Sequence, residues 1–163
     1  MRAIVSNRNV RGSCAAGISA LVIGCWLLMK PATAHDLEHF ASGEIELVGT
    51  ISGNMIITVE FASDEAQRRQ GLMYREELPA RTGMLFIYED EGMRAFWMKN
   101  TLIPLDMVFF DRAGKFVSLQ RDVPPLTLTP RRSTAQYVLE LNAGEAEKHG
   151  IGPETRLVLP VDY

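Results

Sequence analysis

The stretch from Gly92 to Asp111, GMRAFWMKNTLIPLDMVFFD, decides how the rest of this chain is expected to fold. Its two apolar runs, Ala95 to Met98 and Leu105 to Phe110, flank the polar residues 99–101, and Pro104 prevents the chain from continuing straight. The pattern predicts a hairpin or a sharp corner between two strands. In the second run apolar residues occupy both odd and even positions, which predicts a central strand that is covered on both faces.

The corner brings polar side chains close to Trp97, and we interpret this cluster as the best candidate site. Asp106 opens the second apolar run, where a bare buried carboxylate would cost several kcal/mol. Either Asp106 faces Lys99 across the corner and both contact a ligand, or its carboxylate accepts backbone N–H groups from Asn100 and Thr101 and fixes the loop. Both readings stay open at this point.

Two further residues have alternative roles. Trp97 shares a strand face with Lys99 and is either a stacking platform for a flat ligand or a core residue. Arg75 brings its guanidinium to the same cleft or forms a surface ion pair with Glu76 or Glu77. The candidate ligand-binding residues are Arg75, Trp97, Lys99, Asn100, Thr101 and Asp106.

Outside this stretch the sequence predicts further short elements. Alternating residues at 44–48 and 55–61 predict a hairpin, and Ser63 and Gly71 are placed as the cap and the stop of a two-turn helix. Further strands are expected at 84–88, 94–99, 105–111, 115–120, 136–141 and 156–161, and a second helix, capped by Asn142, at 144–149. About eight short strands and two short helices favour a mainly β domain, as a compact antiparallel sandwich or barrel.

The N-terminus has the pattern of a secretory signal peptide. Three arginines precede an uncharged apolar stretch, and Ala32-Thr33-Ala34 predicts cleavage after Ala34, which leaves one domain from 35 to 163 in the periplasm or outside the cell. A lipoprotein anchored through Cys25 is the alternative. After cleavage we expect no stable membrane insertion.

The expected mature chain contains neither of the two cysteines, which excludes thiol nucleophiles and thiolate metal sites. Four of the 17 basic residues lie in the leader whereas all 20 acidic residues follow it, so the mature chain has a formal charge of −7. This charge argues against nucleic acid or an anionic membrane as a general partner. We expect a monomer whose partner is a small polar ligand or an envelope component.

The mature chain contains four distinctive sequence motifs: GLMYR at 71–75, GMLF at 83–86, FWMKNTLIPLD at 96–106 and YVLELNAG at 137–144. Together they resemble the family known as domain of unknown function 192 (DUF192), over about Ile57 to Val158. The resemblance implies a secreted or cell-envelope protein and no established activity. The chain departs from the family at Gly152-Pro153-Glu154, where members commonly have a Gly-Asp turn.

Three functions follow from these observations. The first is an exported domain, not an enzyme, that binds a small polar ligand in a cleft at the corner, without a cofactor or resident metal. The second is a hydrolase of envelope saccharide, which would pair Asp106 with Glu60 or Glu76. The third is periplasmic copper handling by methionine and histidine. The common serine hydrolase, zinc protease and nucleotide-binding motifs do not occur, and all three histidines lie outside the four motifs.

Overall fold

The computed structural model describes residues 37–160. The expected signal peptide, its cleavage point and Cys25 therefore lie outside the described residues. Within the described range, no helix is both long and apolar enough to cross a membrane. The compact unit that begins at Asp36 contains every strand pairing and both apolar clusters described below. Residues 37–160 therefore have a core of their own.

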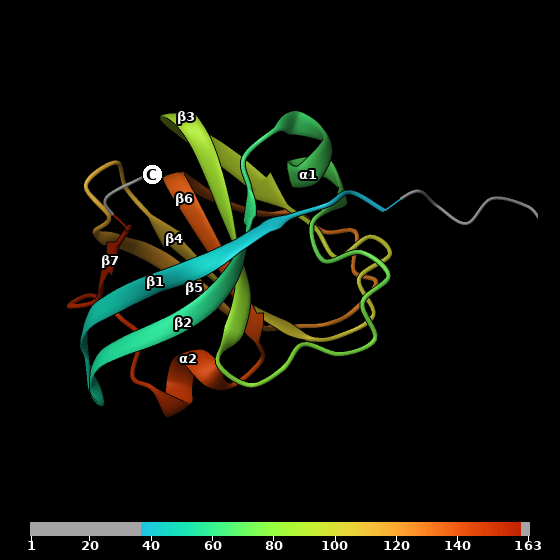
Figure 1. Ribbon diagram of the computed structural model, residues 1–163. Helices are drawn as coiled ribbons and strands as arrows, with labels where there is room; N and C mark the ends of the chain where they lie inside the picture. The colour runs from blue at the N-terminus through green and yellow to red at the C-terminus, as the bar shows by residue number, and fades with distance from the viewer. Residues whose placement is uncertain (1–36, 161–163) are drawn as a thin grey trace, which may run out of the picture. The chain divides into compact units, whose positions relative to one another are not determined.

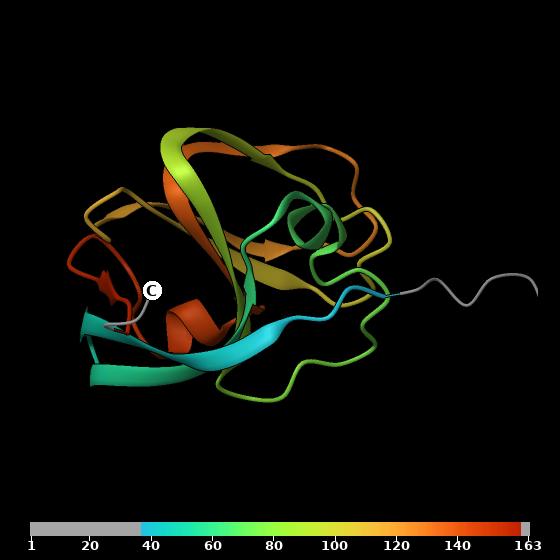
Figure 2. The same ribbon diagram turned by 45° about the horizontal axis from the view of Figure 1, so that its top comes forward.

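One curled sheet forms the body of the domain. Among the described residues it has seven strands in the order β5-β4-β6-β3-β2-β1-β7. Neighbouring strands are antiparallel except β2 and β3, which are parallel. The strands are β1 (Ala41–Thr50), β2 (Gly53–Ala62), β3 (Thr82–Phe96), β4 (Leu105–Phe110), β5 (Phe116–Val123), β6 (Arg131–Asn142) and β7 (Arg156–Val158). Figures 1 and 2 show the sheet curling into a half-barrel. The expectation of a mainly β fold is confirmed, whereas a sandwich or closed barrel of about eight strands is not.

The count differs from the expectation chiefly because residues 84–88 and 94–96 belong to one long strand, β3, while residues 97–99 of the second expected strand lie in the corner that follows it. The acidic residues 89–91, which lie between the two expected strands, fall in an irregularity where the register shifts between Ile87 and Gly92. Arg94 holds this segment, since its Nε donates to the carbonyl of Ala135 and its Nη2 lies 2.9 Å from the Asp90 carboxylate. A bulge bends and twists a strand without ending it.

Two short helices cover different parts of the sheet. In α1 (Glu65–Gln70) the N-cap is Asp64, not Ser63, because Asp64 and Gln67 form a reciprocal capping box. Gly71 ends α1 as expected. The second helix, α2 (Glu145–Lys148), receives no side-chain cap from its own N-cap residue. The expected cap, Asn142, instead donates to the carbonyl of Leu78.

The strands at the centre of the sheet supply side chains to both of its faces. All six residues of β4 are buried, which confirms the expected two-sided strand. Val108 joins the apolar cluster that includes Ala146 of α2, whereas Met107 joins the cluster that includes Leu72, just after α1. The sheet curls around α2, as Figure 2 shows. Each face therefore has its own helix and its own core.

Candidate functional site

Asp106 is a buried structural residue. One oxygen of its carboxylate accepts the N–H of Asp122 at 2.8 Å, and the other accepts the N–H of Ala146 at 2.9 Å. Both sequence-based alternatives, a pair with Lys99 and bonds from the corner amides, are therefore wrong in their partners. Asp106 lies opposite Leu141 of β6, and side chains at paired positions point to the same face of a sheet. Leu141 belongs to the apolar cluster that includes Ala146 of α2, so Asp106 points to the face that α2 covers.

Arg75 also lies away from the corner. Its Nη2 is 2.8 Å from both carboxylate oxygens of Glu60 on β2, so its partner is neither Glu76 nor Glu77. The preceding residue, Tyr74, has a left-handed backbone with φ of 65°. This turn separates Arg75 from Leu72 and Met73, which line the cavity described below.

The other four predicted residues lie together at the corner between β3 and β4. Trp97 is 51% exposed, and the Lys99 ammonium lies 5.7 Å from the centre of its ring. Asn100 donates to the hydroxyl of Tyr74 at 2.9 Å, while its carbonyl accepts the Tyr74 N–H. Trp97 and the buried Thr101 both line a cavity, and Lys99 stands beside its Trp97 wall.

This cavity, which we call the Glu140 cavity, has a volume of about 70 Å³ between β3, β6, the corner and the end of α1. All four sequence motifs meet there, since GLMYR, GMLF, FWMKNTLIPLD and YVLELNAG each supply lining residues. Gly71 permits the close approach of α1: a Cβ there would lie 3.0 Å from the ring of Phe86. The lining residues include Arg68, Gly71, Leu72, Met73, Phe86, Tyr88, Phe96, Trp97, Thr101 and Glu140.

Glu140 gives the cavity its chemical character. It is 4% exposed on β6, and its register neighbours on the two adjacent strands are Met84 and Met107, which share its face. Within residues 37–160 its carboxyl group has no hydrogen-bond or ion-pair partner. Burial raises the pKa of Glu140 to about 8. At neutral pH the group is therefore mainly a protonated acid that can donate one hydrogen bond and accept others.

Tyr88 forms the polar wall of the cavity, with a cation on its ring. The guanidinium carbon of Arg94 lies 3.9 Å from the ring centre and that of Arg68 lies 5.0 Å away. Burial raises the pKa of Tyr88, and the charges of Arg94 and Arg68 oppose this shift. Arg68 is already satisfied, because it donates to the carbonyls of Ser63 and Ile87. Arg68 and Arg94 thus have partners, while the Glu140 carboxyl has none within residues 37–160.

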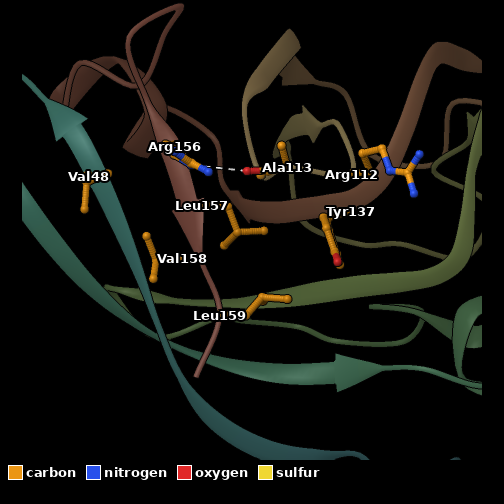
Figure 3. A pocket seen from close by; sticks show the side chains of 9 residues that line it. Val48, Arg112, Ala113, Tyr137, Arg156, Leu157, Val158 and Leu159 are labelled. Carbon is orange, nitrogen blue, oxygen red and sulfur yellow. Dashed lines mark hydrogen bonds between the residues drawn. The ribbon is translucent and has the colours of Figure 1, made fainter. Parts of the chain in front are cut away.

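A larger pocket of about 510 Å³ lies between β1, β7 and the turn before β5. Figure 3 shows Leu157, Leu159 and Tyr137 beside it, with Arg156 directed at the carbonyl of Ala113. Its lining contains two arginines and no acid. The other walls are largely apolar. This pocket is larger than the Glu140 cavity, but it lacks a buried carboxyl group without a partner.

Glu140 is not among the site residues predicted from the sequence, although it lies in the YVLELNAG motif. It stands between Leu139 and Leu141 in YVLELNAG, where an alternating pattern assigns a lone acid to the solvent face. With β6 between β3 and β4, Glu140 is, like Asp106, an acid in a strand that is covered on both faces. No group of three or more His, Cys, Asp or Glu side chains able to hold a metal ion occurs among the described residues.

Comparison with known proteins identifies the family. A Sinorhizobium meliloti protein, provisionally described as a transcription regulator, is 38% identical, with 75% of this chain and 96% of that chain covered and a TM-score of 0.71. A protein of unknown function from Novosphingobium aromaticivorans is 30% identical, with 78% and 91% covered and a TM-score of 0.72. None of the curated proteins matches. The DUF192 family, described as "Uncharacterized ACR", matches residues 48–159, and this chain belongs to it.

Proposed function

We propose that this domain binds a small polar ligand in the Glu140 cavity, with Trp97 packing against the part of the ligand that stays outside. The observation that carries the proposal is the Glu140 carboxyl group, which is buried and has no partner within residues 37–160. Burying a polar group without a hydrogen bond costs about 1–3 kcal/mol in proteins. A ligand that pairs with the carboxyl group removes this cost.

The size of the cavity limits what enters it. Because a cavity of about 150 Å³ holds a molecule the size of benzene, 70 Å³ accommodates one small functional group, not a whole sugar or nucleotide. Protonated Glu140 complements a hydroxyl or an amide, since each has both a donor and an acceptor. The rest of such a ligand would lie over the exposed face of Trp97, as aromatic side chains stack on apolar faces. Hydroxylated or amidated ligands such as sugars fit this description.

Calorimetric titration of the domain 35–163 with glucose, N-acetylglucosamine and acetamide as probes tests the proposal. We expect at least one probe to bind, and we expect Glu140→Met, which keeps the size but removes the polar group, to weaken it about tenfold or more. Glu140→Gln keeps a neutral donor and acceptor and should retain most of the affinity. Leu102→Ala, an exposed change at the same corner, is the control. Equal affinities of wild type and Glu140→Met for every probe that binds would refute the proposal, as would no binding at all.

The pH dependence has a definite sign. The donor on Glu140 exists below its pKa of about 8 and disappears above it. Probe affinity should therefore be constant at lower pH and fall as the pH rises through 8. The Glu140→Gln variant should show no such fall, because an amide does not ionise in this range.

We further propose that the domain works in the periplasm or outside the cell after cleavage behind Ala34, and that it does not turn its ligand over. N-terminal sequencing of protein from a periplasmic extract should begin at His35, whereas a lipid-modified Cys25 would contradict cleavage there. For the hydrolase alternative, Asp106, Glu60 and Glu76 are not among the residues that line the cavity, and no second acid lines it beside Glu140. Incubation with cell-wall fragments should release no reducing sugar.

Two other roles can be tested on the same domain. The relative from S. meliloti is provisionally described as a transcription regulator, but a formal charge of −7 disfavours attraction to phosphate backbones, so we expect no DNA binding in a gel-shift assay. Copper handling is favoured by one observation: thioethers of Met84 and Met107 flank Glu140, and Cu(I) prefers soft ligands. Copper that survives dialysis in wild type but not in Met107→Leu would support that alternative.

A further inference from the structure

Two loops beside the Glu140 cavity expose large apolar side chains. The corner 97–104 carries Trp97 and Leu102, and the loop 124–130 between β5 and β6 carries Leu126 and Leu128, which are 59% and 63% exposed. Backbone hydrogen bonds join the loops, from the Met98 N–H to the carbonyl of Thr127 and from the Leu126 N–H to that of Thr101. We call the surface of these two loops the loop face; the loops project on the same side of the domain in Figures 1 and 2.

The apolar side chains of the loop face contribute little to the core. Leu126 has a left-handed backbone with φ of 59°, a conformation that costs a residue with a Cβ about 1 kcal/mol or more. Glycine or asparagine would adopt it at a lower cost. The strained backbone here presents leucine to solvent, an arrangement that stability alone does not explain.

The charge of the loop face is opposite to that of the whole domain. The loop face contains one base, Lys99, and no acid. Arg131 and Arg132 follow its second loop at the start of β6, and the exposed Asp122 lies two residues before that loop, in a chain whose mature part has a formal charge of −7. The Nε of Arg131 is buried and has no acceptor. Within the described part of the chain, none of these three bases forms an ion pair. Four apolar side chains and three bases without acidic partners thus occupy adjoining segments.

We propose that the loop face docks on an anionic lipid surface, with Trp97 and the leucines entering the headgroup region and the bases contacting lipid phosphates. Tryptophan and leucine beside lysine and arginine are the combination that binds peripheral proteins to anionic bilayers. Separate loops that present projecting side chains suit a bilayer better than a folded partner, which would need a groove for them. Leu102, Leu126 and Leu128 line neither the Glu140 cavity nor the larger pocket.

Sedimentation of the domain 35–163 with lipid vesicles tests the proposal. We expect the domain to pellet with phosphatidylcholine vesicles that contain phosphatidylglycerol and much less with phosphatidylcholine alone, and we expect added salt to release it. The double variant L126S/L128S should weaken binding on the order of tenfold or more. Lys99→Gln and Arg132→Gln should each weaken binding about fivefold, and only to the anionic vesicles.

Ile56→Ser is the matched control, because Ile56 is as exposed as Leu126, at 59%, but lies on β2 before its pairing with β3 begins. It should bind like wild type. Failure to pellet with the anionic vesicles would overturn the proposal, and so would an equal loss in Ile56→Ser. If L126S/L128S instead converts a dimer to a monomer in sedimentation velocity, the loop face is a contact between two copies and the lipid proposal is wrong. Glu140→Met should leave vesicle binding unchanged, which separates this inference from ligand binding in the cavity.

Discussion

At the scale of single residues, two buried acids on neighbouring strands have opposite environments. Both carboxylate oxygens of Asp106 accept backbone N–H groups, whereas the carboxyl group of Glu140 has no partner within residues 37–160. Hydrogen bonds to a carboxylate favour its charged form, and burial without them favours the neutral form. The two acids point to opposite faces of the sheet, so one stabilises the fold and the other faces the cavity.

The raised pKa of Glu140 predicts that the domain is less stable in mild alkali. The folded pKa of about 8 lies above the ordinary value of 4.5, so the folded state binds more protons than the unfolded state between these values. The contribution of this group to stability is therefore fully present below pH 4.5 and falls by at most about 1.4 kcal/mol per unit until the pH passes 8. Urea unfolding at a series of pH values measures it. In Glu140→Gln this component of the slope should disappear; an unchanged slope would show that Glu140 titrates normally.

At the scale of elements, the helix α2 is capped by a side chain from strand β4. Its N-cap residue, Gly144, offers no side chain, and Asp106 accepts the N–H of Ala146 instead. Asp106→Asn would leave one N–H facing an amide NH₂ group, so we expect a loss of about 2–4 kcal/mol in the free energy of unfolding. Amide exchange at Ala146 should accelerate together with exchange at Asp122. The exposed Asp122→Asn should cost less than about 0.5 kcal/mol, and equal losses in the two variants would contradict the assigned role.

The turn that ends α1 sets one wall of the cavity. Gly71 has φ of 51°, and a Cβ there would lie 3.0 Å from the Phe86 ring, whereas Gly53 has φ of 86° and free space around it. Both Gly→Ala changes impose backbone strain, but only Gly71→Ala adds a contact that is too close. We expect Gly71→Ala to cost about 1–2 kcal/mol more than Gly53→Ala in thermal unfolding, since overpacking has a cost of this order. Equal costs would mean that Phe86 moves aside freely.

Local features of the fold could be predicted from the sequence, whereas contacts between distant segments could not. The stop at Gly71, the corner at residues 99–101 and the two-sided strand β4 follow from local patterns, and the structure contains all three. The partners of Asp106, Arg75 and Asn142 could not be predicted, because each lies on an element that is distant in sequence. Glu140 acquires its environment only when β6 is placed between β3 and β4. Strand order is a property of long-range pairing, which periodicity does not encode.

At the scale of the whole molecule, the candidate functions are divided between different regions. The loop face and the Glu140 cavity adjoin at Trp97. Ala146 of α2 belongs to the apolar cluster on the other face of the sheet, and Asp106 points to that same face. A ligand held in the cavity would therefore lie next to the surface that we propose to meet lipid. Removing that surface should alter vesicle binding without unfolding the domain, since the residues involved are exposed.

The far end of the domain provides a test of this division. The two edges of the curled sheet approach each other where the Leu157 N–H donates to the Gly114 carbonyl at 2.7 Å and the Phe116 N–H donates to the Thr155 carbonyl at 3.2 Å. Gly114 has φ of 71°, and a Cβ there would lie 2.2 Å from the carbonyl oxygen of Leu157, so the edges must separate in Gly114→Ala. We expect a loss of about 2–4 kcal/mol in the free energy of unfolding and faster amide exchange at Leu157 and Phe116.

Gly144→Ala is the control for Gly114→Ala, because Gly144 has φ of 86° with no atom near the added Cβ, so it measures the backbone strain alone. Below the unfolding temperature, Gly114→Ala should still sediment with anionic vesicles, and its probe titrations at the Glu140 cavity should match those of wild type, since neither site includes the residues 113–116 and 155–158 where the edges meet. If opening the edges weakens probe binding as strongly as Glu140→Met does, the cavity depends on the curvature of the whole sheet, and the division into separate regions is wrong.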